Sequence, residues 1–154
     1  MGPRLRVQGD ARLDPLLITT PHLRRLPVPS IPLFKVLVND LDEAVGFYTG
    51  KLGMSLLEDK RLGDYRWVLV GYPEQPEFGI NLDLATTEEE KALVGRQAAG
   101  LPMFSIATDN CRRDYEAMLA QGIEFEGQPE SQPWGTAVTL RDVAGNRVHL
   151  SQDA

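Results

Sequence analysis

The sequence has few of the features that mark secreted or membrane-spanning proteins. A single cysteine, Cys111, among 154 residues leaves no internal disulfide bond and no cysteine-based metal site. The longest apolar runs, such as residues 31–34 and 68–70, are far shorter than the roughly 18 residues that a membrane span needs. The N-terminal region lacks the apolar segment of about 7 to 15 residues found in secretory signal peptides. We therefore expect a cytoplasmic protein.

Positive charge is scarce as well. Lysine and arginine number 16 against 22 aspartates and glutamates, so the net charge is −6 and phosphate-rich partners are repelled. We expect no binding to nucleic acid or to an anionic membrane. Hydrophobic residues make up 42% of the chain and charged residues 25%, which is typical of one globular domain at this length.

The charge is unevenly spread along the chain. Residues 1–32 hold five arginines and two aspartates, a net charge of +3, so the remainder carries −9. Five prolines precede residue 30, and no helical or strand periodicity persists there. We expect an N-terminal extension over 1–32, either loosely packed or serving as an arm that crosses a dimer partner or a basic lid over the acidic body.

An internal repeat organises the rest of the chain. Each copy predicts a strand, an amphipathic helix that ends at a glycine (Gly53 or Gly122), and three further strands. Equivalent positions lie about 70 residues apart. In the first copy the strands are expected at 33–38, 55–58, 65–71 and 78–84, and in the second at 103–108, 124–126, 136–141 and 147–151, with helices capped by Asn39 and Asp40 and by Asp109. We divide the chain into module 1 (33–85), a connector with a short helix capped by Thr87 and Glu90 (86–100), and module 2 (101–152).

Short motifs in both copies carry a family resemblance. They are residues 38–44, Phe47-Tyr48, residues 52–54, 120–122, 133–135 and 142–150. In this order and spacing, over roughly residues 32–152, the chain resembles the vicinal oxygen chelate superfamily, which includes glyoxalase I, bleomycin-resistance and fosfomycin-resistance proteins, and extradiol dioxygenases. The resemblance implies an α+β fold in which two βαβββ modules form an open eight-stranded sheet around a cavity, often completed by a second chain. We therefore expect a homodimer.

The resemblance also locates the family metal site. Its four positions fall on Leu33, Asn81, Met103 and His149. Leucine offers no ligand, a thioether suits soft ions, and asparagine is a weak ligand, so His149 alone remains. We predict no family-type metal and no cofactor, which weakens the case for glyoxalase I or dioxygenase chemistry.

Strand alternation extends this placement to a candidate ligand site. The candidate ligand-binding residues are Lys35, Asn81, Asp83, Met103, Ser105, Trp134 and His149. His149 is the candidate general base, unless it is a structural histidine bonded to a neighbour such as Asn81. Lys35 either binds an anionic ligand or pairs with Asp83.

Several other reactive or aromatic side chains have a simpler interpretation. Trp67, like Trp134, either stacks on a flat ligand or packs in the core. Tyr115 and Met118 lie on the buried stripe of the second helix, as does Cys111, for which packing is favoured over a reactive thiol.

Three functions remain open. The first is a metal-free protein that binds a small organic molecule between its modules. The second is a lyase or isomerase in which His149 moves a proton, and the third is an interaction module without a ligand.

Overall fold

The computed structural model describes residues 29–154, so the hypotheses about the N-terminal arm lie almost wholly outside the described residues. Module 1 contains β1 (Leu33–Val38), helix α1 (Leu41–Val45) with a π-helical continuation η3 (Gly46–Lys51), β2 (Ser55–Leu62), β3 (Tyr65–Gly71) and β4 (Gly79–Leu84). The connector holds α2 (Glu88–Leu93). Module 2 contains β5 (Pro102–Ala107), α3 (Cys111–Ala120), β6 (Glu130–Gln132), β7 (Gly135–Arg141) and β8 (Arg147–Asp153).

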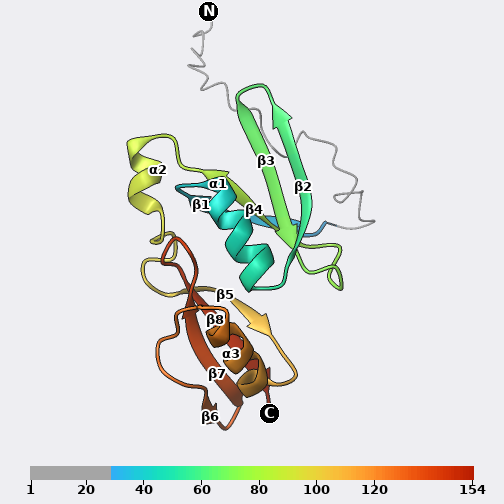
Figure 1. Ribbon diagram of the computed structural model, residues 1–154, viewed down its shortest axis with the longest axis vertical. Coiled ribbons are helices and arrows are strands. Elements are labelled where there is room, and N and C mark those ends of the chain that lie inside the picture. The colour runs from blue at the N-terminus through green and yellow to red at the C-terminus, as the bar shows by residue number, and fades with distance from the viewer. Residues whose placement is uncertain (1–28) are drawn as a thin grey trace, which may run out of the picture.

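Each module forms its own four-stranded mixed sheet (Figure 1). Sheet A has the strand order β1-β4-β3-β2 and sheet B the order β5-β8-β7-β6. In both, the first strand pairs in parallel with the last, and the remaining neighbours are antiparallel. The predicted α+β fold of paired βαβββ modules is confirmed, with its eight strands divided by hydrogen bonding into two sheets of four.

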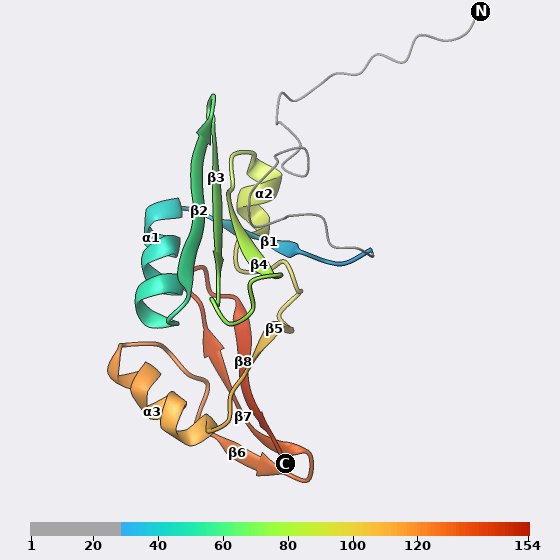
Figure 2. The same ribbon diagram turned by 90° about the vertical axis from the view of Figure 1, so that its right-hand side faces the viewer.

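The two sheets turn equivalent faces in the same direction. Helices α1 and α3 lie on one side of the pair of sheets (Figure 2), and we call the opposite side the inner face. A single hydrophobic core lies on the helix side and runs through both modules, from Val36 and Val68 in sheet A to Leu140 and Leu150 in sheet B. The predicted alternation places these side chains under the helices. The alternate residues of each strand, such as Lys35, Asn81 and His149, therefore lie on the inner faces.

Local signals fix the helix ends. Asp40 caps α1 by accepting a hydrogen bond from the Glu43 backbone nitrogen at 2.9 Å. Thr87 and Glu90 form the predicted capping box of α2. Gly53 and Gly122 both take positive φ after the helices, as predicted. None of the helices within residues 29–154 combines the length and apolarity needed to cross a bilayer.

A buried polar cluster joins the two modules. The carboxylate of Asp142, in the turn between β7 and β8, accepts a hydrogen bond from the Tyr48 hydroxyl of η3 at 2.7 Å. It also accepts bonds from the backbone nitrogens of Ala144 and Asn146 and from the Asn146 side chain, at 2.8 to 2.9 Å. Burial, with the charge and hydrogen bond of Asp142, raises the pKa of Tyr48 well above its ordinary value. The motifs that carry the family resemblance at these positions thus hold module 2 against module 1.

Three local predictions are wrong. The strand expected at 124–126 is reduced to a bridge between Phe125 and Leu140, and β6 forms later. Gly127, at φ +95°, and the nearby Pro129 lie between the Phe125 bridge and β6, and they interrupt the pairing of this stretch with β7. Helix α3 is capped by Asn110 rather than Asp109, because the Asn110 side chain reaches the Arg113 backbone nitrogen at 3.0 Å.

The third concerns Met103, which the family resemblance assigns to a metal position that faces the cavity. The register of β5 against β8 shifts between Pro102 and Phe104, so Met103 lies in an irregularity of the strand. Its half-buried side chain packs against the main hydrophobic core.

Candidate functional site

The inner face of sheet A brings three of the predicted site residues together. Lys35, Asn81 and Asp83 lie on adjacent strands β1 and β4, with Lys35 directly opposite Asn81. The Lys35 ammonium lies 3.1 Å from Asp83 Oδ2. The predicted pairing of these two side chains is confirmed, and it neutralises both charges at the edge of the sheet.

A second polar group on this face was not predicted. Glu58 of β2 is only 7% exposed and accepts a hydrogen bond from the Trp67 indole nitrogen at 2.8 Å on its Oε2. The Lys60 ammonium lies 3.6 Å from the same oxygen. Trp67 is fully buried, so it packs within the protein rather than offering a stacking surface. In the sequence, residues 58–60 are all charged, so no pattern there indicates that the glutamate is the one that is buried.

Among residues 29–154, two buried oxygen atoms on this inner face have no hydrogen-bonding partner. One is Oε1 of Glu58 and the other is Oδ1 of Asn81, whose side chain is fully buried. The amide nitrogen of Asn81 donates to the Val68 carbonyl oxygen at 2.9 Å, which fixes the orientation of the amide and leaves the oxygen free. Both free atoms are acceptors.

The inner face of sheet B carries the other predicted residues. His149 of β8 lies between Ser105 of β5 and Thr139 of β7 in the strand register. A small cavity of about 180 Å³ is lined here by Glu130, Gln132, Trp134, Ala137, Val138, Thr139 and His149. Trp134 is 57% exposed and half-buried His149 is beside it in this cavity. The structure thus brings together Trp134 and His149, which are 15 residues apart in sequence.

The residues at the four metal positions do not fit the family metal. Leu33 has no donor atom, Met103 packs against the core, and Asn81 keeps only its amide oxygen after its bond to Val68. A single imidazole and one amide oxygen fall short of the three or four nitrogen, oxygen or thiolate ligands that a zinc or iron site uses. Within residues 29–154, no group of three or more His, Cys, Asp or Glu side chains is arranged to hold a metal ion.

His149 does not bond to Asn81, although that neighbour was one of its proposed partners. The two residues belong to different sheets, and the Asn81 amide nitrogen is used within sheet A. Within the described part of the chain the imidazole makes no hydrogen bond, so it faces the cavity with both ring nitrogens free. Such a histidine can contact a ligand or accept a proton.

The edge of sheet A is closed by a residue that sequence reasoning missed. Gln97 of the connector accepts a hydrogen bond from the Leu37 backbone nitrogen at 2.7 Å and donates to the Lys35 carbonyl at 3.2 Å. Its side chain thus takes the place of a neighbouring strand along β1. A glutamine in a polar connector gives no sequence signal for this role.

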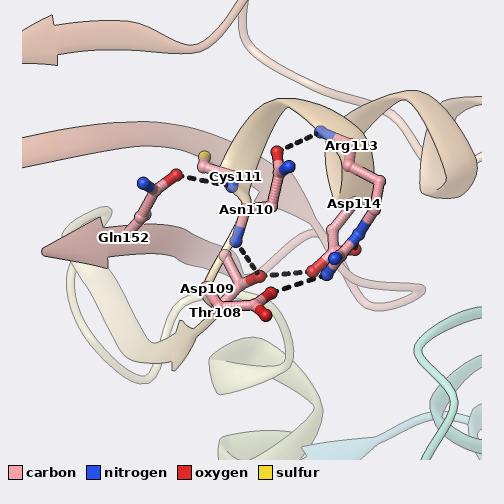
Figure 3. Close-up of polar contacts among 7 residues, drawn as sticks. All are labelled: Thr108, Asp109, Asn110, Cys111, Arg113, Asp114 and Gln152. Atoms are coloured by element: carbon pink, nitrogen blue, oxygen red, sulfur yellow. Dashed lines mark hydrogen bonds and ion pairs between the residues drawn. The ribbon is translucent and has the colours of Figure 1, made fainter.

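The start of α3 is a second polar cluster, and its contacts are structural (Figure 3). The Arg113 guanidinium bridges Asp109 and Asp114, and it holds the pKa of Asp114 below its usual range. The Thr108 hydroxyl donates to the same Asp114 carboxylate. Cys111 is fully buried behind this cap, and burial raises the pKa of its thiol. The packing role predicted for Cys111 is confirmed.

A cavity of about 380 Å³ lies at the junction of the modules. Its walls include Phe34, Phe78 and Phe104, whose rings pack at centroid distances of 5.4 to 5.7 Å. Phe34 and Phe104 also pack against the main core, whereas Ser105 and Ala107, which line the same cavity, are exposed, so the cavity lies where the ends of β1 and β4 meet β5.

Paired βαβββ modules with polar side chains on their inner faces define a protein of the vicinal oxygen chelate type. A family model described as Glyoxalase/Bleomycin resistance protein/Dioxygenase superfamily matches residues 30–150, and the chain belongs to this family.

Three similar proteins illustrate the relationship. An uncharacterised protein of Shewanella frigidimarina is 37% identical over 125 residues, which cover 80% of this chain and 93% of that protein. The solved structure of UcmS2 is 27% identical with a TM-score of 0.73, covering 80% of this chain and 98% of UcmS2. TnmS3, an antibiotic binding protein from Streptomyces sp. CB03234, is 25% identical with a TM-score of 0.65, covering 84% of this chain and 100% of TnmS3.

Proposed function

We propose that this protein binds a small organic molecule on the inner faces of its two sheets, without the metal of its family. The observation that carries the proposal is the cavity of about 180 Å³ beside Trp134 and His149. Exposed tryptophan next to a histidine with free ring nitrogens suits a flat ligand that carries a polar group. The likeness to TnmS3, an antibiotic binding protein, supports small-molecule binding.

Each residue of the proposed site has a distinct role. Trp134 offers an aromatic face, and His149 a hydrogen bond to the ligand. The small side chains of Ser105 and Ala107 leave room above β5, since both residues are exposed. The Lys35–Asp83 pair bounds the site on sheet A.

A thermal-shift screen of small aromatic compounds tests this proposal. Compounds that raise the melting temperature of the wild-type protein should lose most of that effect in the Trp134→Ala variant. The matched control is Leu119→Ala, which removes an exposed side chain from α3 on the opposite side of the sheets. Equal stabilisation of all three proteins by every active compound would contradict the proposed site.

The same compounds separate a binding protein from an enzyme. If a compound is converted by the wild type, and His149→Ala still binds it but no longer converts it, the protein is a lyase or isomerase with His149 as the base. If the His149→Ala variant loses binding and no conversion is seen, the protein is a binding protein.

We also propose that the protein is a cytoplasmic homodimer. The open inner face of sheet B, with exposed Trp134 at its end, is the surface that a second copy would complete. Light scattering across a concentration series tests this, and a monomer at all concentrations would contradict it.

A further inference from the structure

The inner face of sheet A holds two buried hydrogen-bond acceptors for which the described residues supply no donor. Glu58 lies opposite Leu69, and Leu69 lies opposite Asn81, so the two free oxygens belong to one row across three strands. Neighbouring strands are roughly 5 Å apart, which puts the two backbones about 10 Å from each other. A buried acceptor without a partner is destabilising, and such atoms are rare unless a ligand or water satisfies them.

The two free oxygens suit an uncharged hydrogen-bond donor better than a charged ligand. The Lys60 ammonium lies 3.6 Å from Glu58, and the Lys35 ammonium lies 3.1 Å from Asp83. The four charges on this face therefore cancel. A cationic ligand would be repelled by the two lysines, and an anionic ligand would face the free carboxylate oxygen. A neutral N–H or O–H group avoids both of these repulsions and can donate a hydrogen bond to the free oxygens.

The geometry points to a subsite on sheet A that binds a neutral hydrogen-bond donor of the ligand, a hydroxyl or an amide N–H, with Glu58 as the specificity-determining residue. This inference rests on the proposed function, because it names the chemical class of the same ligand. Both oxygens are buried, so the donor reaches them by displacing the flexible side chains of Lys35 and Lys60, which are 41% and 39% exposed.

A hydrogen bond from Trp67 holds the Glu58 carboxylate in one orientation. Its Oε2 atom is held by the indole nitrogen of Trp67, so Oε1 cannot turn away without breaking a buried bond. A ligand that presents an ether or carbonyl oxygen instead would set acceptor against acceptor. The subsite thus separates hydroxylated compounds from their methylated counterparts.

A matched pair of probes tests the subsite: 2-naphthol, which is neutral near pH 7 and donates an O–H, and 2-methoxynaphthalene, which has the same ring system but no donor. The chain has two tryptophans, so a nitrogen-15 NMR spectrum shows two indole N–H signals. Trp67 reports on Glu58 through their hydrogen bond. Trp134 reports on the cavity in sheet B.

We expect 2-naphthol to shift the Trp67 signal in a saturable way, and 2-methoxynaphthalene to bind there about tenfold to a hundredfold more weakly, the effect of one hydrogen bond to a charged acceptor. In the Glu58→Gln variant, the single amide oxygen must accept from Trp67, so an NH₂ donor replaces Oε1. The preference for 2-naphthol should then disappear. Glu116→Gln, an exposed position on α3, is the matched control and should keep the preference.

Other outcomes overturn the inference. Equal effects of both probes on Trp67, or an unchanged preference in Glu58→Gln, would show that Oε1 selects nothing. No effect of either probe on Trp67 would mean that water alone satisfies these oxygens. If Trp134 shifts while Trp67 does not, the proposed function holds and this subsite fails. If neither signal moves with these probes or with the compounds of the thermal-shift screen, the proposed function fails as well.

Discussion

The hydrogen bond between Tyr48 and Asp142 should be a principal link between the two modules. Replacing Tyr48 with phenylalanine removes only the hydroxyl and leaves the buried ring in place. The lost bond is a 2.7 Å contact to a buried carboxylate, a type that contributes about 1.5–3 kcal/mol. Asp142 keeps three other donors, from Ala144 and Asn146, so we expect the lower half of that range, about 2 kcal/mol.

Urea denaturation at pH 7 measures this change. A loss of about 2 kcal/mol corresponds to a fall in melting temperature of roughly 4–8 °C for a domain of this size. The slope of the denaturation curve should stay the same, because the area exposed on unfolding does not change. An unfolding free energy for Tyr48→Phe within 0.5 kcal/mol of the wild type, a threshold taken from the usual scatter of surface substitutions, would refute the argument.

The pH dependence of the same pair provides a second check. The pKa of Tyr48 is raised in the folded state, so its contribution is complete below its unfolded pKa, about 10, and is lost as the pH rises through the folded pKa. The wild type should therefore lose stability faster than Tyr48→Phe above about pH 10, and the two should converge. Parallel curves for the two proteins in that range would contradict the assignment.

Three further predictions concern other parts of the fold. Gly95→Ala should cost at least about 2 kcal/mol, since φ is +74° and a Cβ would lie 2.2 Å from the Ala144 carbonyl oxygen, whereas Gly50→Ala, with nothing within 4 Å, should be near neutral in denaturation. A hydrogen bond from Arg147 and the charges of Arg141 and Arg147 lower the pKa of Glu126, so its contribution is present above the unfolded value of about 4.3 and is lost as the pH falls through the lower folded value; the small stability difference between wild type and Glu126→Gln should shrink as the pH falls below about 4, and in 1 M salt. Buried Cys111 should react with a thiol reagent only as fast as the protein opens, and immediate labelling in the native state would contradict its burial.

Much of the fold follows from local patterns in the sequence. The alternation in β1 separates Val36 and Val38, which face the core, from Lys35, and the same rule holds for Asn81 in β4. Period-two alternation works because a strand points successive side chains to opposite faces whatever it pairs with. The rule does not extend through the start of β5, where the register against β8 shifts between Pro102 and Phe104, so the carried-over position of Met103 lies in an irregularity of the strand.

Strand alternation predicted only some of the residues of the candidate site. The sequence placed His149 on an inner face and identified the Lys35–Asp83 pair, because both depend on strand position. It gave no indication that Glu58 would be buried against Trp67, since that depends on the register of the β2–β3 hairpin. The role of Gln97 at the edge of β1 likewise depends on where the connector lies.

The sequence by itself determined the two modules, the glycines at which their helices end and, outside the irregular start of β5, the side of the first and last strands that faces the core. These properties depend on backbone geometry and hydrophobic periodicity, which act over a few residues. Only the tertiary structure decided that Tyr48 would bond to Asp142 across the modules, and that Trp134 and His149 would share a cavity. Within the described part of the chain it also left two buried oxygens on sheet A without donors, because hydrogen bonding between distant residues depends on distances that no local pattern specifies.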